Sequence, residues 1–205
     1  MLNFDEKYIE FKSNGGVLDI EISPYSNAYS LKHAQNVLVE EFLRKWDNGQ
    51  YDWDKLRRSR VALSPDQFFG CFFDFELRKP LIRGVSSSHL NHYFLYDTLE
   101  SVSNIMNYRI EELSRKFGPN AGGYSYAFLE PPSTLSLGNS ILDKGEFFLT
   151  FSEYLFSDFE QIQVFDWDTS HSYFDAGHEW WGSFLWTIYN PIKRWNILIA
   201  ASATD

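Results

Sequence analysis

Two apolar segments near the end of the chain, residues 183–189 and 195–201, constrain the fold more than any other feature. Both alternate sets of side chains in each segment are apolar, as expected for strands that are covered on both faces of a sheet. Residues 190–194 between them, Asn-Pro-Ile-Lys-Arg, form a loop short enough to close a hairpin. The segments therefore predict an antiparallel pair of strands in the interior of a sheet.

Further strands are predicted from shorter patterns. Residues 17–22 alternate apolar and acidic side chains, which is typical of a half-buried strand. Runs rich in aromatic and aliphatic residues at 124–129, 147–156 and 161–166 are interpreted as additional strands. Because the connections are short, we expect these strands to pair mainly antiparallel.

Two helices are predicted in the first part of the chain. Residues 27–46 carry apolar side chains at helical spacing, at Leu31, Ala34, Leu38 and Phe42. A second helix is expected to follow the three serines at 86–88 and to end at Gly118-Pro119, with its apolar stripe at Leu95, Leu99, Val102, Met106, Ile110 and Leu113. Residues 65–77 fit either a short helix or a buried strand.

Together these elements predict an α+β fold, with a mainly antiparallel sheet in the C-terminal half and helices from the N-terminal half packed on it. We expect residues 1–205 to form a single globular domain, because neither half contains a linker long enough to separate two bodies. A change of composition near residues 118–123 is the one candidate for a boundary.

Acidic and aromatic residues are concentrated together in the second half. Residues 117–192 contain 19 aromatic residues and ten carboxylates but a single cation, Lys144. An acidic disordered segment would be poor in aromatic residues, so this composition indicates a folded, anionic face that attracts a basic partner. The alternative is that the acidity serves solubility alone. The carboxylates are Glu130, Asp143, Glu146, Glu153, Asp158, Glu160, Asp166, Asp168, Asp175 and Glu179.

The charge also excludes partners. With a net charge of −10, the chain is not expected to bind nucleic acid or an anionic membrane surface. The absence of an apolar run of signal or membrane-spanning length predicts a cytoplasmic protein. Cys71, the single cysteine, lies among phenylalanines and is expected to be a buried, inert thiol.

The densest polar segment is residues 166–179, which contain two histidines, His171 and His178, among several carboxylates. These are suitable ligands for zinc, manganese or iron, and a metal-assisted hydrolase is one hypothesis for the chain. The spacing matches no known ligand pattern, however, and Gly177 with its Ser and Asp neighbours equally fits turn chemistry. We therefore expect no metal and no other cofactor.

Other catalytic signatures are weak. His89 and His92 could share one face of a helix, but they lack the spacing of a metalloprotease motif. A Cys71–His dyad would need a lowered thiol pKa, whereas the apolar surroundings predict a raised one. The pair Trp180-Trp181 fits either a sugar-stacking platform or one buried and one surface ring.

The closing segment, Glu179-Trp180-Trp181-Gly182 through Ala203-Thr204-Asp205, looks similar to the ends of uncharacterised bacterial proteins of about this size. As a compact, acidic, aromatic-rich chain without a catalytic motif, the whole sequence resembles immunity proteins of bacterial toxin–immunity systems, including contact-dependent inhibition. The resemblance implies a small cytoplasmic protein that blocks a basic toxin, frequently a nuclease, by covering its active site.

These observations predict a protein-binding surface for a basic partner such as a toxin, with carboxylates for attraction and aromatic rings as anchors. A structural subunit or homodimer is the remaining alternative to this binder and to the hydrolase. The residues expected to contact the partner are Asp166, Trp167, Asp168, Tyr173, Asp175, Glu179 and Trp181.

Overall fold

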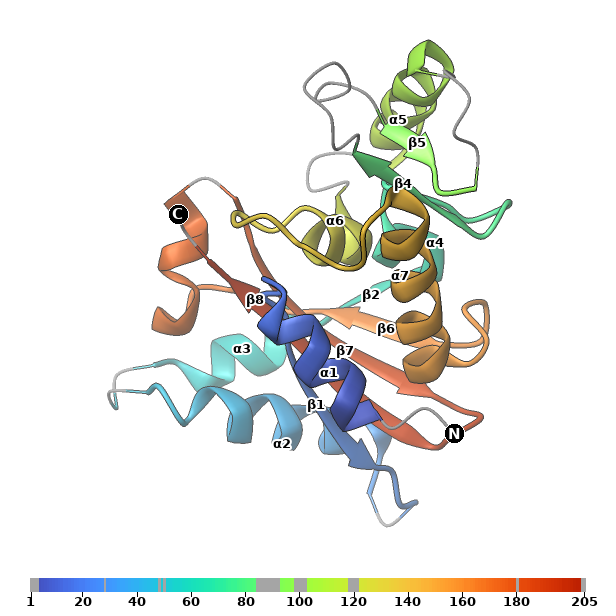
Figure 1. Cartoon of the computed structure of the whole chain (residues 1–205). Helices are drawn as coiled ribbons and strands as arrows, with labels where there is room; N and C mark the ends of the chain where they lie inside the picture. The colour runs from blue at the N-terminus through green and yellow to red at the C-terminus, as the bar shows by residue number, and fades with distance from the viewer. Residues whose placement is uncertain are drawn as a thin grey trace. The chain divides into compact units, whose positions relative to one another are not determined.

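The computed structural model describes residues 4–27, 29–47, 49, 51–83, 93–97, 103–117, 122–179 and 181–203 (Figure 1). The chain forms two compact units that interleave in sequence. Unit 1 comprises residues 1–16 and 66–154, and unit 2 comprises residues 17–65 and 155–205. None of the three changes of unit, after residues 16, 65 and 154, falls at residues 118–123.

Unit 2 is built on a five-stranded antiparallel sheet in the order β1-β8-β7-β6-β2 (Figure 1). Three of its strands come from the C-terminal part of the chain, as predicted, and β1 confirms the strand expected at 17–22. The strands are β1 (Asp19–Pro24), β2 (Val61–Leu63), β6 (Gln163–Asp166), β7 (Ser183–Asn190) and β8 (Trp195–Ser202).

The predicted hairpin is confirmed by β7 and β8, which are adjacent and lie in the interior of the sheet. Ile188 and Ile197 are paired, and both are fully buried. The turn is held by the side chain of Asn190, whose Oδ1 accepts hydrogen bonds from the backbone N–H groups of Ile192 (2.9 Å) and Lys193 (3.1 Å). An asparagine that bonds the backbone two residues ahead is a common way to fix a tight turn.

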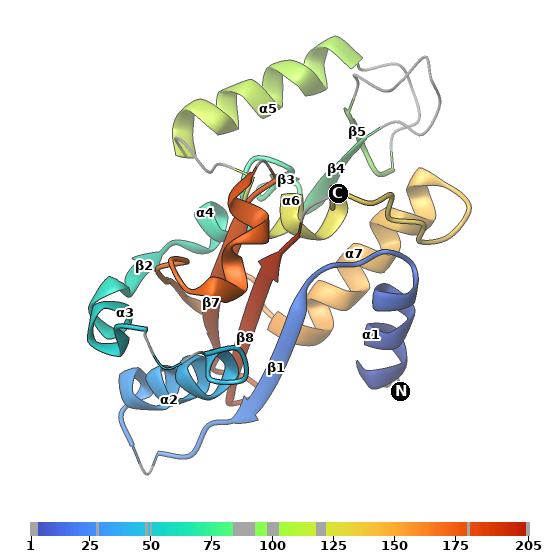
Figure 2. The ribbon, with the colours of Figure 1, turned by 90° about the vertical axis from the view of Figure 1, so that its left-hand side faces the viewer.

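Helix α2 (Leu31–Leu43) covers one face of this sheet (Figure 2). The helix predicted at 27–46 is confirmed, but it begins only at Leu31, because Ser30 caps it by accepting a hydrogen bond from the N–H of His33. The short helix α3 (Trp53–Ser59) adds Leu56 to the same core. The buried side chains of this core are Leu38, Val39, Phe42, Leu43, Leu56, Trp167, Phe174, Leu185, Leu198 and Ala200.

Unit 1 combines helices with a small three-stranded sheet in the order β3-β4-β5. Its core is aromatic: for example, Phe11 stacks on Phe128 at 4.4 Å between ring centroids, and Tyr124 contacts Phe148 at 5.5 Å. Its elements are α1 (Phe4–Ser13), α4 (Pro65–Phe69), β3 (Phe73–Asp74), β4 (Lys79–Arg83), β5 (Tyr93–Leu95), α5 (Ser103–Phe117), α6 (Gly123–Leu129) and α7 (Ile141–Phe156). Pro65 at the start of α4 and the last two residues of α7, Leu155 and Phe156, belong to unit 2.

Two predicted strands are wrong. Residues 124–129 lie in α6 and residues 147–156 lie in α7. In α7 the buried residues Phe148, Phe151 and Leu155 recur every three or four positions, so helical packing outweighs the strand preference of the aromatic residues. In α6 nearly every residue is buried, which leaves no periodicity by which a helix can be told from a strand.

The long helix predicted to follow the serines at 86–88, with Leu95 first in its apolar stripe, is also corrected. Leu95 belongs to β5, where it pairs with Leu81 of β4, and the helix α5 begins only at Ser103. The serines at 86–88 and the histidines His89 and His92 lie outside the described residues. Residues 65–77, left open above, contain both the helix α4 and the strand β3. Cys71 is buried as expected, and burial raises the pKa of its thiol.

The α+β class is thus confirmed, with a five-stranded antiparallel sheet in unit 2 and a three-stranded one in unit 1. Among the residues that the structure describes, no helix combines the length and the apolar character needed to cross a membrane.

Candidate partner-binding site

The polar segment 166–179 lies in unit 2 and connects β6 to β7. It leaves the sheet at Asp166 and runs through two short 3₁₀ helices, η2 (Ser172–Phe174) and η3 (Ala176–Glu179). Its end is closed by a hydrogen bond from the N–H of Gly182 to the carbonyl of Gly177, 2.9 Å long. A Cβ atom on Gly177 would lie 2.2 Å from the carbonyl oxygen of Gly182, so this close approach requires glycine.

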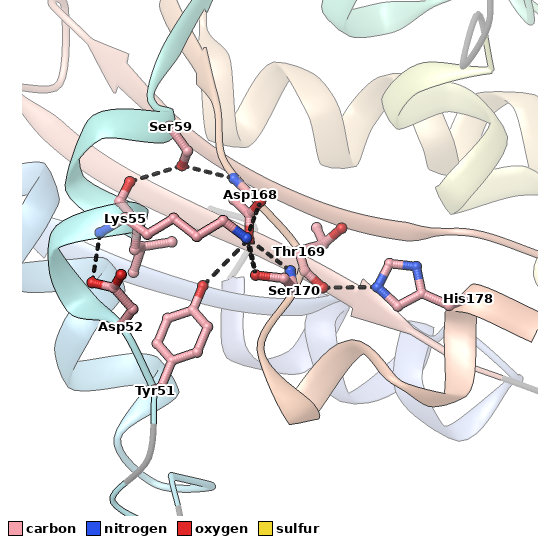
Figure 3. A network of polar contacts seen from close by, with 9 residues as sticks. Tyr51, Asp52, Lys55, Ser59, Asp168, Thr169, Ser170 and His178 are labelled. Atoms are coloured by element: carbon pink, nitrogen blue, oxygen red, sulfur yellow. Dashed lines mark hydrogen bonds and ion pairs between the residues drawn. The ribbon is translucent and has the colours of Figure 1, made fainter.

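Asp168 is the centre of a polar network that ties this segment to α3 (Figure 3). Its Oδ1 accepts hydrogen bonds from the N–H of Ser170 (2.9 Å) and from the hydroxyl of the same serine, and its Oδ2 lies 3.4 Å from Nζ of Lys55. The N–H of Asp168 donates to Oγ of Ser59 at 2.9 Å. Lys55 also donates to Oγ of Ser170. The predicted contact residue Asp168 is therefore already paired within the fold.

The protonation of Asp168 follows from these contacts. Burial tends to raise the pKa of its carboxyl, but the hydrogen bonds from Ser170 and the charge of Lys55 outweigh burial, so its pKa lies below the usual value. The carboxylate is ionised at neutral pH, and its charge is offset by Lys55.

The pKa of Asp166 is shifted in the opposite direction from that of Asp168. Burial raises the pKa of its carboxyl to about 6, although hydrogen bonds from Trp167 and Trp186 act in the opposite direction. The residue is only partly exposed, at the end of β6, where it pairs with Trp186 of β7. Of the three aspartates expected to attract a partner, Asp166 is thus the least able to present a full negative charge.

Two of the expected aromatic anchors need correction. Trp167 is 3% exposed and Trp181 is 4% exposed, so both rings belong to the core and not to the surface. The indole N–H of Trp167 donates to Oγ1 of Thr187 at 3.0 Å, which satisfies its only donor inside the protein. The ring of Trp181 packs edge to face on Phe184 at 5.4 Å. Trp180 lies outside the described residues.

Tyr173 is more exposed than Trp167 and Trp181, as an aromatic anchor for a partner must be. Its ring is half-buried and its hydroxyl donates to Oδ2 of Asp19 at 2.6 Å. It contacts Trp46, just beyond the end of α2, at 4.8 Å between centroids, and Trp46 is 45% exposed. Trp46 was not among the predicted site residues. Its position four residues after Phe42 continues the apolar stripe of the helix, and that pattern gives no sign that the ring stays exposed.

The remaining predicted carboxylates, Asp175 and Glu179, are both exposed. Within the described part of the chain, neither carboxylate has a hydrogen-bond or ion-pair partner, although the charge of Asp175 acts on His171. Asp175 lies two residues from Tyr173 and Glu179 ends η3. We call Trp46, Tyr173, Asp175 and Glu179 the acidic–aromatic surface.

One ring nitrogen of each of the two histidines is hydrogen-bonded to a backbone group. His171 is buried, and its Nδ1 accepts a hydrogen bond from the N–H of Tyr173 at 3.1 Å. Its ring meets Tyr51 edge to face at 4.6 Å, and burial lowers its pKa although Asp47 and Asp175 act in the opposite direction. Nε2 of His178 lies 2.8 Å from the carbonyl of Thr169 (Figure 3). In the described ranges, no three His, Cys, Asp or Glu residues are grouped so that they could hold a metal ion.

No protein-family model and no curated protein matches the chain. Two crystal structures of citrus MAF1, in different space groups, are similar to it over almost its whole length. One has 10% sequence identity and covers 97% of this chain and 99% of that chain; the other has 11% identity and covers 98% and 100%. The TM-score is 0.34 for both, which is too low to establish a shared fold.

Proposed function

We propose that this protein is an immunity-type inhibitor that binds a basic protein partner through the acidic–aromatic surface. The observation that supports the proposal most directly is an exposed tryptophan, Trp46, packed on Tyr173. Tyr173 belongs to the segment 166–179, which also carries two exposed carboxylates without side-chain partners among the described residues, those of Asp175 and Glu179.

The composition of this surface suits such a partner. Tryptophan and tyrosine are the residues that most often dominate the energy of protein interfaces. Unpaired carboxylates attract Lys and Arg side chains of a partner and raise the rate of association. An arginine of the partner could also stack on the exposed face of Trp46. In contrast, Asp168 would have to lose Lys55 before it could bind a cation of another protein.

A nuclease toxin is a partner of the right chemistry. Such an enzyme presents cations to the phosphates of its substrate, and carboxylates can occupy the same positions with bidentate Arg–carboxylate contacts. The net charge of −10 supports rapid association with such a surface. Occlusion of the catalytic cations would then inhibit the enzyme without any chemistry by this protein.

The proposal is tested with a partner captured from cell extract on the immobilised protein, released by salt and purified. We expect the association rate to fall markedly between about 50 and 500 mM salt, because the Debye length shrinks from over 10 Å to a few ångström. Asp175→Lys and Glu179→Lys should slow association, whereas Trp46→Ala should mainly speed dissociation.

Matched controls are Glu146→Lys and Glu153→Lys, which reverse exposed carboxylates on α7 that also have no partner among the described residues. These variants change the net charge by the same amount but leave the acidic–aromatic surface intact. Equal effects of the two pairs would show that overall charge, and not this surface, drives binding. Failure to capture any salt-released protein would also count against the proposal.

A further inference from the structure

The buried histidine His171 is held by contacts that require an uncharged ring. It is 1% exposed and precedes η2 in unit 2. Its Nδ1 accepts a hydrogen bond from the N–H of Tyr173 at 3.1 Å, so the proton of the neutral ring is on Nε2. Nε2 is also buried and has no hydrogen-bond partner among the described residues. A second proton would therefore have to bind to the nitrogen that Tyr173 already uses.

Aromatic side chains of unit 2 lie against this imidazole. The ring of Tyr51 meets it edge to face at 4.6 Å, and the ring of Trp53 lies 6.1 Å away between centroids. The hydroxyl of Tyr51 donates to Oδ1 of Asp168 at 3.5 Å, and burial raises the pKa of Tyr51, so this neighbour is neutral. These contacts supply no charge that could stabilise an imidazolium ion.

The nearby charged groups do not compensate for the burial of His171. Burial lowers its pKa below the usual 6.5, although the carboxylates of Asp47, between α2 and α3, and of Asp175 act in the opposite direction. The guanidinium of Arg44 lies 4.4 Å from the ring centroid of Trp53 and pairs with Glu40 at 3.5 Å. The folded surroundings therefore favour the neutral form of His171.

Protonation would remove the contact that begins η2. A charged imidazole carries an N–H on both nitrogens, so Nδ1 and the N–H of Tyr173 would become two facing donors. The charge would also be buried without a hydrogen-bond partner at Nε2. Both costs disappear when the ring moves into water, and such a movement displaces Tyr173 and Asp175 of the acidic–aromatic surface.

We propose that His171 is a pH-sensitive latch, which keeps residues 171–175 closed while its ring is neutral and releases them in mild acid. The closed form binds the proton less tightly than the open form. It is therefore fully favoured above about pH 6.5 and loses this advantage as the pH falls below that value. The latch concerns the shape of the chain alone and does not rest on the proposed function.

His178 in the same segment has the opposite arrangement and provides a control. Its Nε2 lies 2.8 Å from the carbonyl oxygen of Thr169, which is an acceptor, so Nε2 carries a proton in both charge states of the ring. The side chain is exposed, so a charge on it stays in water. Protonation of His178 keeps its contact.

The two aspartates at the start of the segment do not produce a release in mild acid. Burial raises the pKa of Asp166 to about 6, so protonation of Asp166 stabilises the fold as the pH falls. Burial also acts to raise the pKa of Asp168, but hydrogen bonds from Ser170 and the charge of Lys55 outweigh it. Asp168 thus keeps its charge and its contacts at about pH 5, since its pKa lies below the usual value near 4.

The experiment measures amide hydrogen exchange of the full-length protein at about pH 7.5 and pH 5, with each rate divided by that of an unfolded chain at the same pH. We expect the protection of residues 171–175 to fall at least tenfold, with a ceiling of about thirtyfold set by an open ring of ordinary pKa. Protection of β7 and β8 should stay unchanged, which separates local release from unfolding of the sheet.

Two variants assign the effect to one ring. In His171→Asn the amide Oδ1 replaces Nδ1 as acceptor for the N–H of Tyr173 and does not ionise, so residues 171–175 should stay protected at both pH values. His178→Asn should open in acid as the wild-type protein does.

A nitrogen NMR titration of the wild-type ring keeps the test valid if His171→Asn folds poorly. The proton should be on Nε2 at neutral pH, and the charging of the ring should follow the same pH course as the loss of protection. The proposal is overturned if His171 becomes charged while residues 171–175 stay protected, or if protection is unchanged at pH 5. Parallel loss of protection in β7 and β8, or an unaltered pH dependence in a folded His171→Asn protein, would overturn it as well.

Discussion

Nζ of Lys55 lies 3.4 Å from Oδ2 of Asp168, which joins helix α3 to the segment between β6 and β7. The same carboxylate accepts two hydrogen bonds from Ser170, and its own N–H is bonded to Ser59. The pair is partly exposed, so its Coulomb energy alone is small. Asp168 therefore holds the shape of the segment that presents Tyr173 and Asp175.

The two partners of this pair should differ in their effect on stability. We expect Asp168→Ala to lower the free energy of unfolding by about 1–2 kcal/mol, because it removes several hydrogen bonds at once. Lys55→Met should cost less than about 1 kcal/mol. Urea denaturation of both variants measures this, and equal costs would show that Asp168 contributes through the ion pair alone.

Asp166 should make stability depend on pH. Its pKa is raised to about 6 in the folded protein, above the usual value near 4, so the folded state binds this proton more tightly. The resulting stabilisation is fully present below about pH 4 and is lost as the pH rises through 6. Asp166→Asn should then stabilise the protein by roughly 1–3 kcal/mol at pH 8 and have little effect at pH 4. Melting temperatures of both proteins across this range test the sign.

The exposed Trp46 and the buried Trp181 should contribute very differently to stability. Trp181→Ala should destabilise the protein by about 3–5 kcal/mol, because it empties a buried site. Trp46→Ala should cost about 1 kcal/mol or less, since the ring is 45% exposed. Denaturant unfolding of the two variants gives the comparison, and a cost of Trp46→Ala close to that of Trp181→Ala would contradict the surface position of Trp46.

The interior position of β8 predicts a strong effect of buried charge. Ile197→Asp and Ile199→Asp should each abolish soluble expression, because both side chains are fully buried and an aspartate there would have no partner. Ile192→Asp, in the β7–β8 turn at 57% exposure, is the control and should be tolerated. Soluble yield and melting temperature measure the outcome; a stable Ile197→Asp protein would be incompatible with this strand.

The sequence alone determined the parts of the fold whose pattern is local. The β7–β8 hairpin follows from apolar residues on both alternate sets around an Asn-Pro turn, and α2 follows from an apolar stripe at helical spacing. Both patterns place their buried side chains without help from the rest of the chain. The strand preference of aromatic residues misled the prediction for 147–156, because their three-to-four spacing in α7 is satisfied only when other rings of unit 1 pack on it.

The candidate site was determined by tertiary structure. The sequence identified Tyr173, Asp175 and Glu179 as candidates, but it could not distinguish them from Asp166, Asp168, Trp167 and Trp181 in the same stretch. Whether a carboxylate keeps its charge and whether a ring is exposed depend on residues far away in the sequence. Lys55 neutralises Asp168, the sheet desolvates Asp166, and the end of α2 brings Trp46 onto Tyr173. Burial and charge pairing arise only when these segments meet in space.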